Sequence, residues 1–183
     1  PEDTCVVAGT ELEAIIYGID PVSDTLIIEA FSELFNLHGA TYSPDPPVYQ
    51  PSAPALPTPA QIGFSWDTRC SHIKEQPYQV TFKITDKPAN GPKLVTFKAW
   101  NIRVVGPPPV WESAALNMPD RTASLTWETY ECSNAETIQV WRKVDSLGYT
   151  PGNCETGMPE SLGYELIATL PAGETSFTDT NGG

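Results

Sequence analysis

The chain lacks features that several classes of protein need. No apolar run approaches the roughly 20 residues that span a bilayer, so we expect no membrane insertion. The chain has neither an initiator methionine nor a signal peptide, and we expect it to be a segment of a longer protein. Basic residues are also few: 10 Lys and Arg against 23 Asp and Glu give a net charge of −13. That charge argues against nucleic acid or an anionic membrane as a partner.

Signatures of catalysis and of zinc binding are missing too. The chain has no nucleophile elbow, no Gly-rich phosphate loop and no CxxC pair. His38 and His72 lie in different segments without a Cys, Glu or His at ligand spacing, which favours ordinary surface or core histidines. The acidic residues leave a glycosidase-type carboxylate pair open, although none stands out. We therefore expect this segment not to be an enzyme.

The few basic residues are unevenly placed. Residues 1–68 contain ten acidic residues and no Lys or Arg, whereas residues 69–103 carry seven basic residues against Glu75 and Asp86. If both stretches fold into one sandwich, acidic strands can lie beside basic ones and pair across the sheet. The alternative is that the acidic and the basic residues lie on separate solvent-exposed surfaces and do not pair.

What the chain has in quantity is proline, with 19 residues, and glycine, with 13, which favours short strands and turns over long helices. Apolar and polar residues alternate strictly from Tyr78 to Thr85, which predicts a strand with one buried face. Residues 94–105 are rich in β-branched and aromatic side chains. Their apolar phase shifts from odd to even positions, which predicts a β-bulge near Lys98 and Ala99.

The strand pattern predicts an all-β fold of two tandem β-sandwiches, over residues 1–106 and 107–183, joined by the stiff Pro107-Pro108-Pro109. Residues 31–37 fit either a helical turn or a strand. Residues 43–60 contain seven prolines and are expected to form an extended loop. Other strands are predicted at residues 12–17, 25–30, 62–66, 122–127, 137–142, 164–170 and 176–179.

The four cysteines fall two in each predicted module. This division predicts one disulfide in each, Cys5–Cys70 and Cys132–Cys154, contributing roughly 3–4.5 kcal/mol apiece by loop entropy. Disulfides imply an oxidising compartment: the periplasm, the cell surface or the outside of the cell. The alternative is four reduced, buried thiols in a cytosolic protein.

The second module resembles a fibronectin type III domain. Leu125-Thr-Trp127 is similar to the family's second strand with its core tryptophan, and Ile138-Gln-Val-Trp-Arg-Lys143 to the third. Tyr164-Glu-Leu-Ile-Ala-Thr-Leu170 and Thr175-Ser-Phe-Thr-Asp-Thr180 are similar to the following strand and the turn beyond it. The resemblance implies seven strands, so we expect the last two to be lacking here.

The first module is similar to bacterial cadherin-like or immunoglobulin-like repeats, through Asp20-Pro-Val-Ser-Asp24-Thr-Leu, Gly63-Phe-Ser-Trp66 and Ile84-Thr-Asp86. Phe64-Ser-Trp-Asp-Thr-Arg-Cys-Ser-His72, Gln76-Pro-Tyr-Gln-Val80 and the run from Trp100 to Pro109 resemble gliding-motility-associated surface proteins of Bacteroidota. The resemblance implies a long, multi-modular extracellular protein exported by type IX secretion.

The same resemblances imply candidate sites. Asp20, Asp24 and Asp86 occupy places where cadherin-like repeats hold calcium, and the alternative is aspartates that favour turns and strand ends. Thr25 and Ser146 match the Asp-Ser/Thr-apolar acceptor pattern for O-glycosylation in Bacteroidota, with coincidence as the alternative. Trp141 is expected to face outward, where it packs or offers a stacking surface for a sugar.

These expectations point to a non-catalytic structural or adhesive segment of a large cell-surface protein. Its expected partners are other modules of the same chain, secretion or surface machinery, and surface glycans. The alternative function is a carbohydrate-binding accessory module of a secreted polysaccharide-degrading enzyme.

Overall fold

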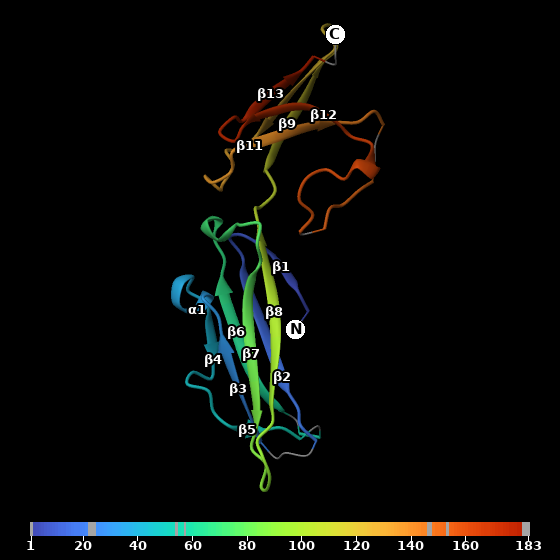
Figure 1. Ribbon diagram of the computed structural model, residues 1–183. Coiled ribbons are helices and arrows are strands. Elements are labelled where there is room, and N and C mark those ends of the chain that lie inside the picture. Colours follow the sequence, from blue (N-terminus) through green and yellow to red (C-terminus); the bar gives the residue numbers. More distant parts are fainter. Residues whose placement is uncertain are drawn as a thin grey trace. The chain divides into compact units, whose positions relative to one another are not determined.

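The computed structural model describes residues 2–21, 25–53, 55–56, 58–145, 148–152 and 154–180. Strands make up most of the regular structure, so the protein is all-β (Figure 1). The chain divides into two compact units, Pro1–Val105 (unit 1) and Gly106–Gly183 (unit 2). Within the described ranges no helix is long and apolar enough to traverse a bilayer.

Unit 1 is a sandwich of a five-stranded sheet, in the order β1-β8-β7-β3-β5, and a three-stranded sheet, in the order β2-β6-β4. Strand β1 runs parallel to β8, and the other paired strands are antiparallel. The elements are β1 (Thr4–Val7), β2 (Glu11–Gly18), β3 (Thr25–Phe31), α1 (Leu34–Leu37), β4 (Thr41–Ser43), β5 (Gln50–Pro51), β6 (Ala60–Asp67), the 3₁₀ turn η1 (Cys70–His72), β7 (Tyr78–Asp86) and β8 (Val95–Val105).

The core of unit 1 lies between these two sheets because alternate residues of each strand point inward. Trp66 of β6 and Phe82 of β7 are fully buried, and Trp100 of β8 is nearly so. The Trp100 ring packs edge-on against Phe64, with ring centroids 5.1 Å apart. Trp66 and Trp100 thus belong to this core, and Trp127 is buried in the core of unit 2.

The bulge predicted near Lys98 and Ala99 is wrong. Strands β7 and β8 pair in one unbroken register from Tyr78 opposite Ile102 to Thr85 opposite Val95. The apolar phase changes for another reason: residues Val95 to Ala99 are all exposed, so burial does not impose alternation on them. Their apolar side chains follow the outer face of the sheet instead.

Short elements form in residues 31–37, predicted as either a helical turn or a strand, and in residues 43–60, predicted as an extended loop. Phe31 ends strand β3, and Leu34–Leu37 form the single helical turn α1. Within the proline-rich segment, the two-residue strand β5 pairs with the start of β3. This segment therefore lies along the sheet edge at that point.

Unit 2 also has two sheets, one in the order β13-β10-β9 and one containing β11 and β12. Its elements are β9 (Trp111–Asn117), β10 (Thr122–Trp127), β11 (Thr137–Arg142), the 3₁₀ turn η2 (Glu160–Leu162), β12 (Glu165–Pro171) and β13 (Ser176–Asp179). The small core centres on Trp127, Ile138 and Val140, with partly buried neighbours from β10, β12 and β13.

Candidate interaction surface

The outer face of strands β3, β7 and β8 in unit 1 carries an apolar patch. Residues that alternate with the core positions point to this face, and pairing aligns them in rows across the strands. The rows are Ile27–Thr85–Val95, Glu29–Lys83–Phe97 and Phe31–Thr81–Ala99. We call the set Ile27, Glu29, Phe31, Lys83, Val95 and Phe97 the front face.

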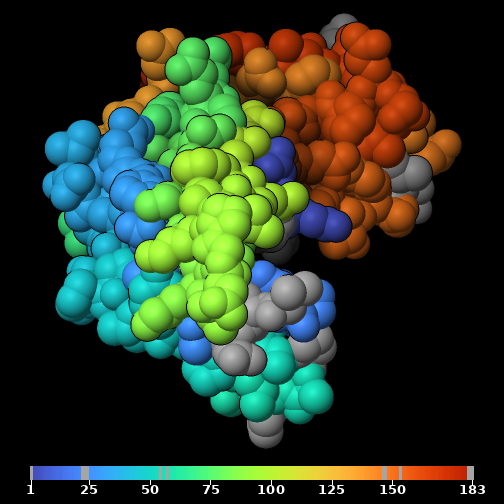
Figure 2. Space-filling view, turned by 60° about the horizontal axis from the view of Figure 1, so that its bottom comes forward, coloured from blue at the N-terminus to red at the C-terminus, as the bar shows by residue number. Residues whose placement is uncertain are grey.

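Three of the four apolar members of the front face are exposed although they lie in regular strands, and the fourth, Ile27, is half-buried. Phe97 is 63% exposed, Phe31 51% and Val95 46%. A single exposed apolar residue is normal, but several on one sheet face form a patch of the kind that marks interaction sites. Figure 2 shows the yellow-green chain of β8, and of the hairpin leading into it, lying open at the surface of unit 1.

An ion pair lies among these apolar residues. Lys83 Nζ contacts Glu29 Oε2 at 2.7 Å, and about a third of each side chain is exposed. This pair agrees with the expectation that acidic and basic strands lie side by side in one sandwich. It gives the front face one positive and one negative group close together, ringed by apolar area.

One of the rows that cross the front face also contains a buried polar group, the hydroxyl of Thr85. Thr85 lies between Ile27 and Val95 in its row and is only 8% exposed. Within the described part of the chain, its buried Oγ1 has no hydrogen-bond partner. Most buried hydroxyls in proteins have a hydrogen-bond partner, so Thr85 is an exception in this sheet.

The three predicted calcium residues have different environments. Asp86 is buried and its Oδ1 accepts a hydrogen bond from Leu94 N at 2.6 Å, which closes the start of the β7–β8 turn. The backbone carbonyl of Asp20 accepts a hydrogen bond from Ser52 Oγ at 3.4 Å. Asp24 lies outside the described residues. Among those described, no three His, Cys, Asp or Glu side chains form a group that could hold a metal, and the complete site stays a prediction.

The predicted covalent modifications have different outcomes. All four cysteines, Cys5, Cys70, Cys132 and Cys154, are disulfide-bonded. Unit 1 holds the first two and unit 2 the others, and the predicted pairing stays a prediction. Thr25 is half-buried at the first position of β3, and Ser146 lies outside the described residues.

Sequence inspection missed a cluster around the two histidines. His38 follows α1, and its carbonyl accepts a hydrogen bond from Trp66 Nε1 at 2.9 Å. The His38 ring lies 5.2 Å from that of His72. His72 is buried, and its Nδ1 accepts a hydrogen bond from Arg69 N at 3.1 Å. No spacing in the sequence signals this contact, because only the sandwich brings the two segments together.

A hollow of about 470 Å³ adjoins the front face at Phe31. Aromatic side chains and polar groups both line it: Phe31, Phe35, Tyr42, Asn36, Thr41 and Asp45. The Phe35 and Tyr42 rings meet edge-on with centroids 4.8 Å apart, and Tyr42 Oη donates a hydrogen bond to Asp45 Oδ1 at 3.2 Å. Burial, together with the Asp45 carboxylate, raises the pKa of Tyr42, so its hydroxyl stays protonated.

The strand order of unit 1 defines its class. Strands β2, β6 and β4 face β8, β7 and β3, with the buried tryptophans between them, which is the arrangement of an immunoglobulin-like sandwich. No protein-family model matches the chain, and no curated protein sequence matches it.

Two solved structures are similar to the chain at a low level. One is a chaperone–tip adhesin complex of CFA/I fimbriae biogenesis, 11% identical with a TM-score of 0.35, over 97% of this chain and 82% of that one. The other is a chicken TCR, 9% identical with a TM-score of 0.31, over 99% of this chain and 88% of that one. Similarity this low carries no argument about function.

Proposed function

We propose that the chain is a non-catalytic, adhesive segment of an exported cell-surface protein that acts in gliding motility or surface attachment. The observation that carries the proposal is the front face, where Phe31, Val95 and Phe97 are exposed around the Glu29–Lys83 pair. An apolar sheet face with one central ion pair suits contact with another macromolecule, because apolar area supplies affinity and the charges fix orientation.

The cysteines support the location outside the cell. All four are in disulfides, which persist in oxidising compartments and are rare in the cytosol. In this proposal the sandwich units space and display the front face. Neighbouring modules of a longer chain and the secretion machinery are the other expected partners.

Attachment of coated beads tests the adhesive function. Beads carrying the chain should attach to the cell envelope of the producing bacterium and to the surfaces on which it moves. The double variant Phe31→Ser/Phe97→Ser should reduce attachment at least tenfold. The matched control, Ile19→Ser/Leu37→Ser, removes exposed apolar residues outside the front face and should attach like the wild type. Equal attachment of both variants would reject the proposal.

The second candidate function is carbohydrate binding, favoured by the hollow beside Phe31. Sugar rings stack on aromatic faces while carboxylates and amides bond their hydroxyls, and the hollow offers both kinds of group in Phe35, Asn36 and Asp45. Trp141 is a separate candidate; it is half-buried on β11, opposite Leu166.

A glycan array separates the two candidates. Binding that is lost in Asp45→Ala or in Trp141→Ala, but not in Phe97→Ser, would favour the carbohydrate-binding module. Phe97 lies outside the residues that line the hollow, which makes it the control. An array without binding by the wild-type chain counts against this second function.

A further inference from the structure

The smaller sheet of unit 1 has a glycine at its centre. Gly63 lies within the middle strand β6, opposite Ile15 of β2 on one side and Ser43 of β4 on the other. Its neighbours Ile62 and Phe64 are buried in the core, so position 63 faces outward. A glycine inside a strand lowers stability, because it has no side chain to pack and loses much conformational freedom on folding. Some other property of this position must therefore favour glycine.

The fold itself supplies no such property. Pairing with β2 and with β4 continues in one register through Gly63, so no bulge is present. The backbone there lies outside the left-handed region that favours glycine. Among the described residues, the atom nearest to an added Cβ is the carbonyl oxygen of Ser43, at an ordinary contact distance of 3.9 Å. Close approach of a ligand to the backbone is the remaining common reason for a glycine within a strand.

A hollow of about 290 Å³ lies over Gly63 on the outer face of this sheet, and we call it the Gly63 hollow. Two rows of outward-facing residues cross it: Ile15–Gly63–Ser43 and Glu13–Ser65–Thr41. Sites for small molecules usually measure about 300–1,000 Å³. The Gly63 hollow therefore suits a single side chain of a partner better than a glycan of several rings.

The polar groups of the Gly63 hollow are suited to accept hydrogen bonds. Ser65 donates its only hydroxyl proton to Glu11 Oε1 at 3.0 Å, so toward a ligand its oxygen can only accept. The Glu13 carboxylate also only accepts, and in the described part of the chain it forms no ion pair. The exposed hydroxyls of Thr41 and Ser43 can do either. Since no side chain with an N–H is among the described residues of the lining, a ligand should bring several donors.

The charge around the hollow favours a cationic ligand. Glu11 and Asp67 are exposed and lie opposite each other, next to the Glu13–Ser65 row. Strands β2, β4 and β6 contain no Lys or Arg. Like charges directly opposite each other repel, and a cation bound beside them would reduce that repulsion. On the other side of the hollow, Ile15 is 57% exposed and offers apolar area.

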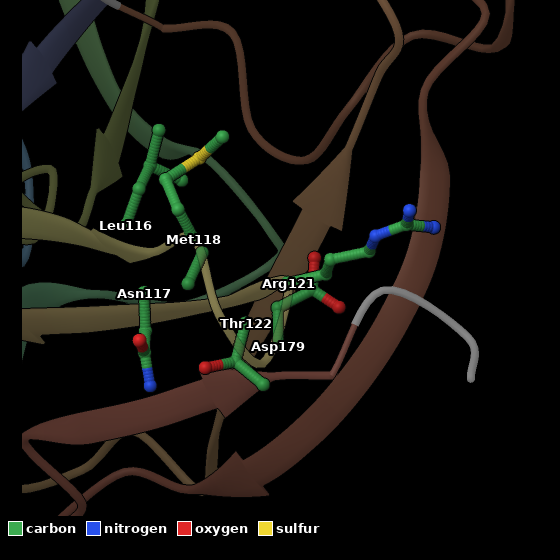
Figure 3. A pocket seen from close by; sticks show the side chains of 7 residues that line it. Leu116, Asn117, Met118, Arg121, Thr122 and Asp179 are labelled. Carbon is green, nitrogen blue, oxygen red and sulfur yellow. The ribbon is translucent and has the colours of Figure 1, made fainter.

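A hollow in unit 2 has the opposite character. It measures about 400 Å³, and Figure 3 shows Leu116 and Met118 close together beside it. The cationic side chain of Arg121 belongs to its lining. The carboxylate of Asp179, which also lines it, already accepts a hydrogen bond from Nη1 of Arg142 at 3.0 Å. A cationic ligand would meet positive charge there, whereas the Gly63 hollow offers it an acidic surface.

We propose that the Gly63 hollow binds an arginine side chain of a partner protein. A guanidinium is planar and carries five N–H donors, so it can lie flat on the uncovered backbone of Gly63. In this position it donates to the Glu13 carboxylate and to the Ser65 hydroxyl oxygen, while the aliphatic part of the arginine contacts Ile15. A lysine ammonium concentrates its donors at one point and matches this flat site less well.

Titration of the whole chain with N-acetyl-arginine amide, followed by NMR, tests the site. The backbone amide signals of Gly63 and Ser65 should shift and reach saturation at millimolar ligand. N-acetyl-citrulline amide has nearly the same shape without the charge and should bind at least tenfold less tightly. N-acetyl-lysine amide should also bind less tightly than the arginine derivative. Absence of a saturating shift, or binding of either comparison ligand as tight as that of the arginine derivative, overturns the proposal.

Filling the hollow separates binding from stability. Valine is favoured in strands and glycine is not, so Gly63→Val should raise the unfolding midpoint. Its side chain occupies the hollow, so the same variant should bind N-acetyl-arginine amide at least tenfold less tightly. A purely structural role of Gly63 would not produce this combination. Affinity equal to that of the wild type in a folded Gly63→Val contradicts the site.

Removal of one charge tests the same site even if Gly63→Val folds poorly. Glu13→Gln keeps the size of the side chain and should bind N-acetyl-arginine amide at least tenfold less tightly. The matched control Glu75→Gln removes an exposed carboxylate outside the hollow and should bind like the wild type. Equal weakening by both variants would mean that the ligand follows the net charge of −13, and would overturn the proposal. A saturating shift of Gly63 with methyl glucoside, but not with the arginine derivative, would assign the hollow to a sugar instead.

This inference does not depend on the proposed adhesive function, because the front face lies on the other sheet of unit 1. The front-face variant Phe31→Ser/Phe97→Ser should bind N-acetyl-arginine amide like the wild type. Loss of binding in that variant would place the ligand on the front face and overturn the assignment to Gly63.

Discussion

The imidazole rings of His38 and His72 lie perpendicular to each other, with centroids 5.2 Å apart. Trp66 lies 5.0 Å from His72, and Tyr78 lies 5.1 Å from His38. The pair thus belongs to an aromatic cluster at the end of the unit 1 core. Lys74 Nζ sits 3.6 Å from the centre of the Tyr78 ring and also forms an ion pair with Glu33 at 3.3 Å.

This cluster predicts acid sensitivity of unit 1. Burial, and then the nearby His38 and Arg69, lower the pKa of His72 below its usual value of 6.5. The folded state thus disfavours the protonated ring. The stability that the neutral His72 ring contributes is fully present above pH 6.5, and it is lost as the pH falls through the lowered pKa. Thermal midpoints measured between pH 8 and pH 5 should be flat at first and then decline.

Two variants test the assignment of that decline to His72. His72→Asn keeps an acceptor for Arg69 N and removes the titration, so its decline should be smaller. His38→Asn keeps the titrating ring but removes a positive neighbour, so its decline should end at a less acidic pH. Equal profiles for wild type and His72→Asn would show that another group is responsible.

Substitutions on the two faces of the β3–β7–β8 sheet should differ sharply in stability. Phe82 is fully buried, and Phe82→Ala should cost about 3–5 kcal/mol of unfolding free energy. Phe97 is 63% exposed, and Phe97→Ser should change it by no more than about 0.5 kcal/mol. Chemical denaturation measures both. A large loss for Phe97→Ser would mean that the front face is part of the core.

The disulfides should be visible by mass. The oxidised chain should weigh four hydrogens less than the reduced chain, since all four cysteines are bonded. Peptide mapping should recover Cys5 linked to Cys70 and Cys132 linked to Cys154. A peptide joining Cys5 to Cys132 or to Cys154 would contradict the predicted pairing.

Calcium gives a further prediction. If Asp20, Asp24 and Asp86 form a site, calcium should raise the unfolding midpoint and a chelator should lower it, because a ligand stabilises the state that binds it. Asp86→Asn keeps an acceptor for Leu94 N and should abolish this difference. Identical midpoints with calcium and with chelator would leave Asp86 only its hydrogen bond to the turn.

Strands with one buried face could be predicted from the sequence, and strands without one could not. Burial of every second residue imposes the alternation seen from Tyr78 to Thr85, and β7 forms there. Strand β9 is exposed along its length, so no pattern marks it. Strand β1 is only four residues long, and it pairs in parallel with β8, which lies almost a hundred residues later in the sequence, so no local pattern predicts this pairing.

The candidate surface escaped prediction for a related reason. The apolar side chains of Val95 and Phe97 predict a buried strand with a bulge, because the sequence alone does not distinguish an exposed apolar face from a buried one. Glu29 and Lys83 could be expected to face each other only as members of acidic and basic strands. Their alignment with Phe97 depends on the register of three strands, which is a tertiary property.

Retention of cells under flow tests most directly whether the front face carries the function. The whole chain, displayed on a non-adherent bacterium, should hold cells on the surfaces to which beads carrying the chain attach. Phe31→Ser/Phe97→Ser should reduce retention at least tenfold, whereas Asp45→Ala and Ile19→Ser/Leu37→Ser should leave it unchanged. Retention that survives the front-face change but is lost in Asp45→Ala would contradict the account and assign binding to the hollow.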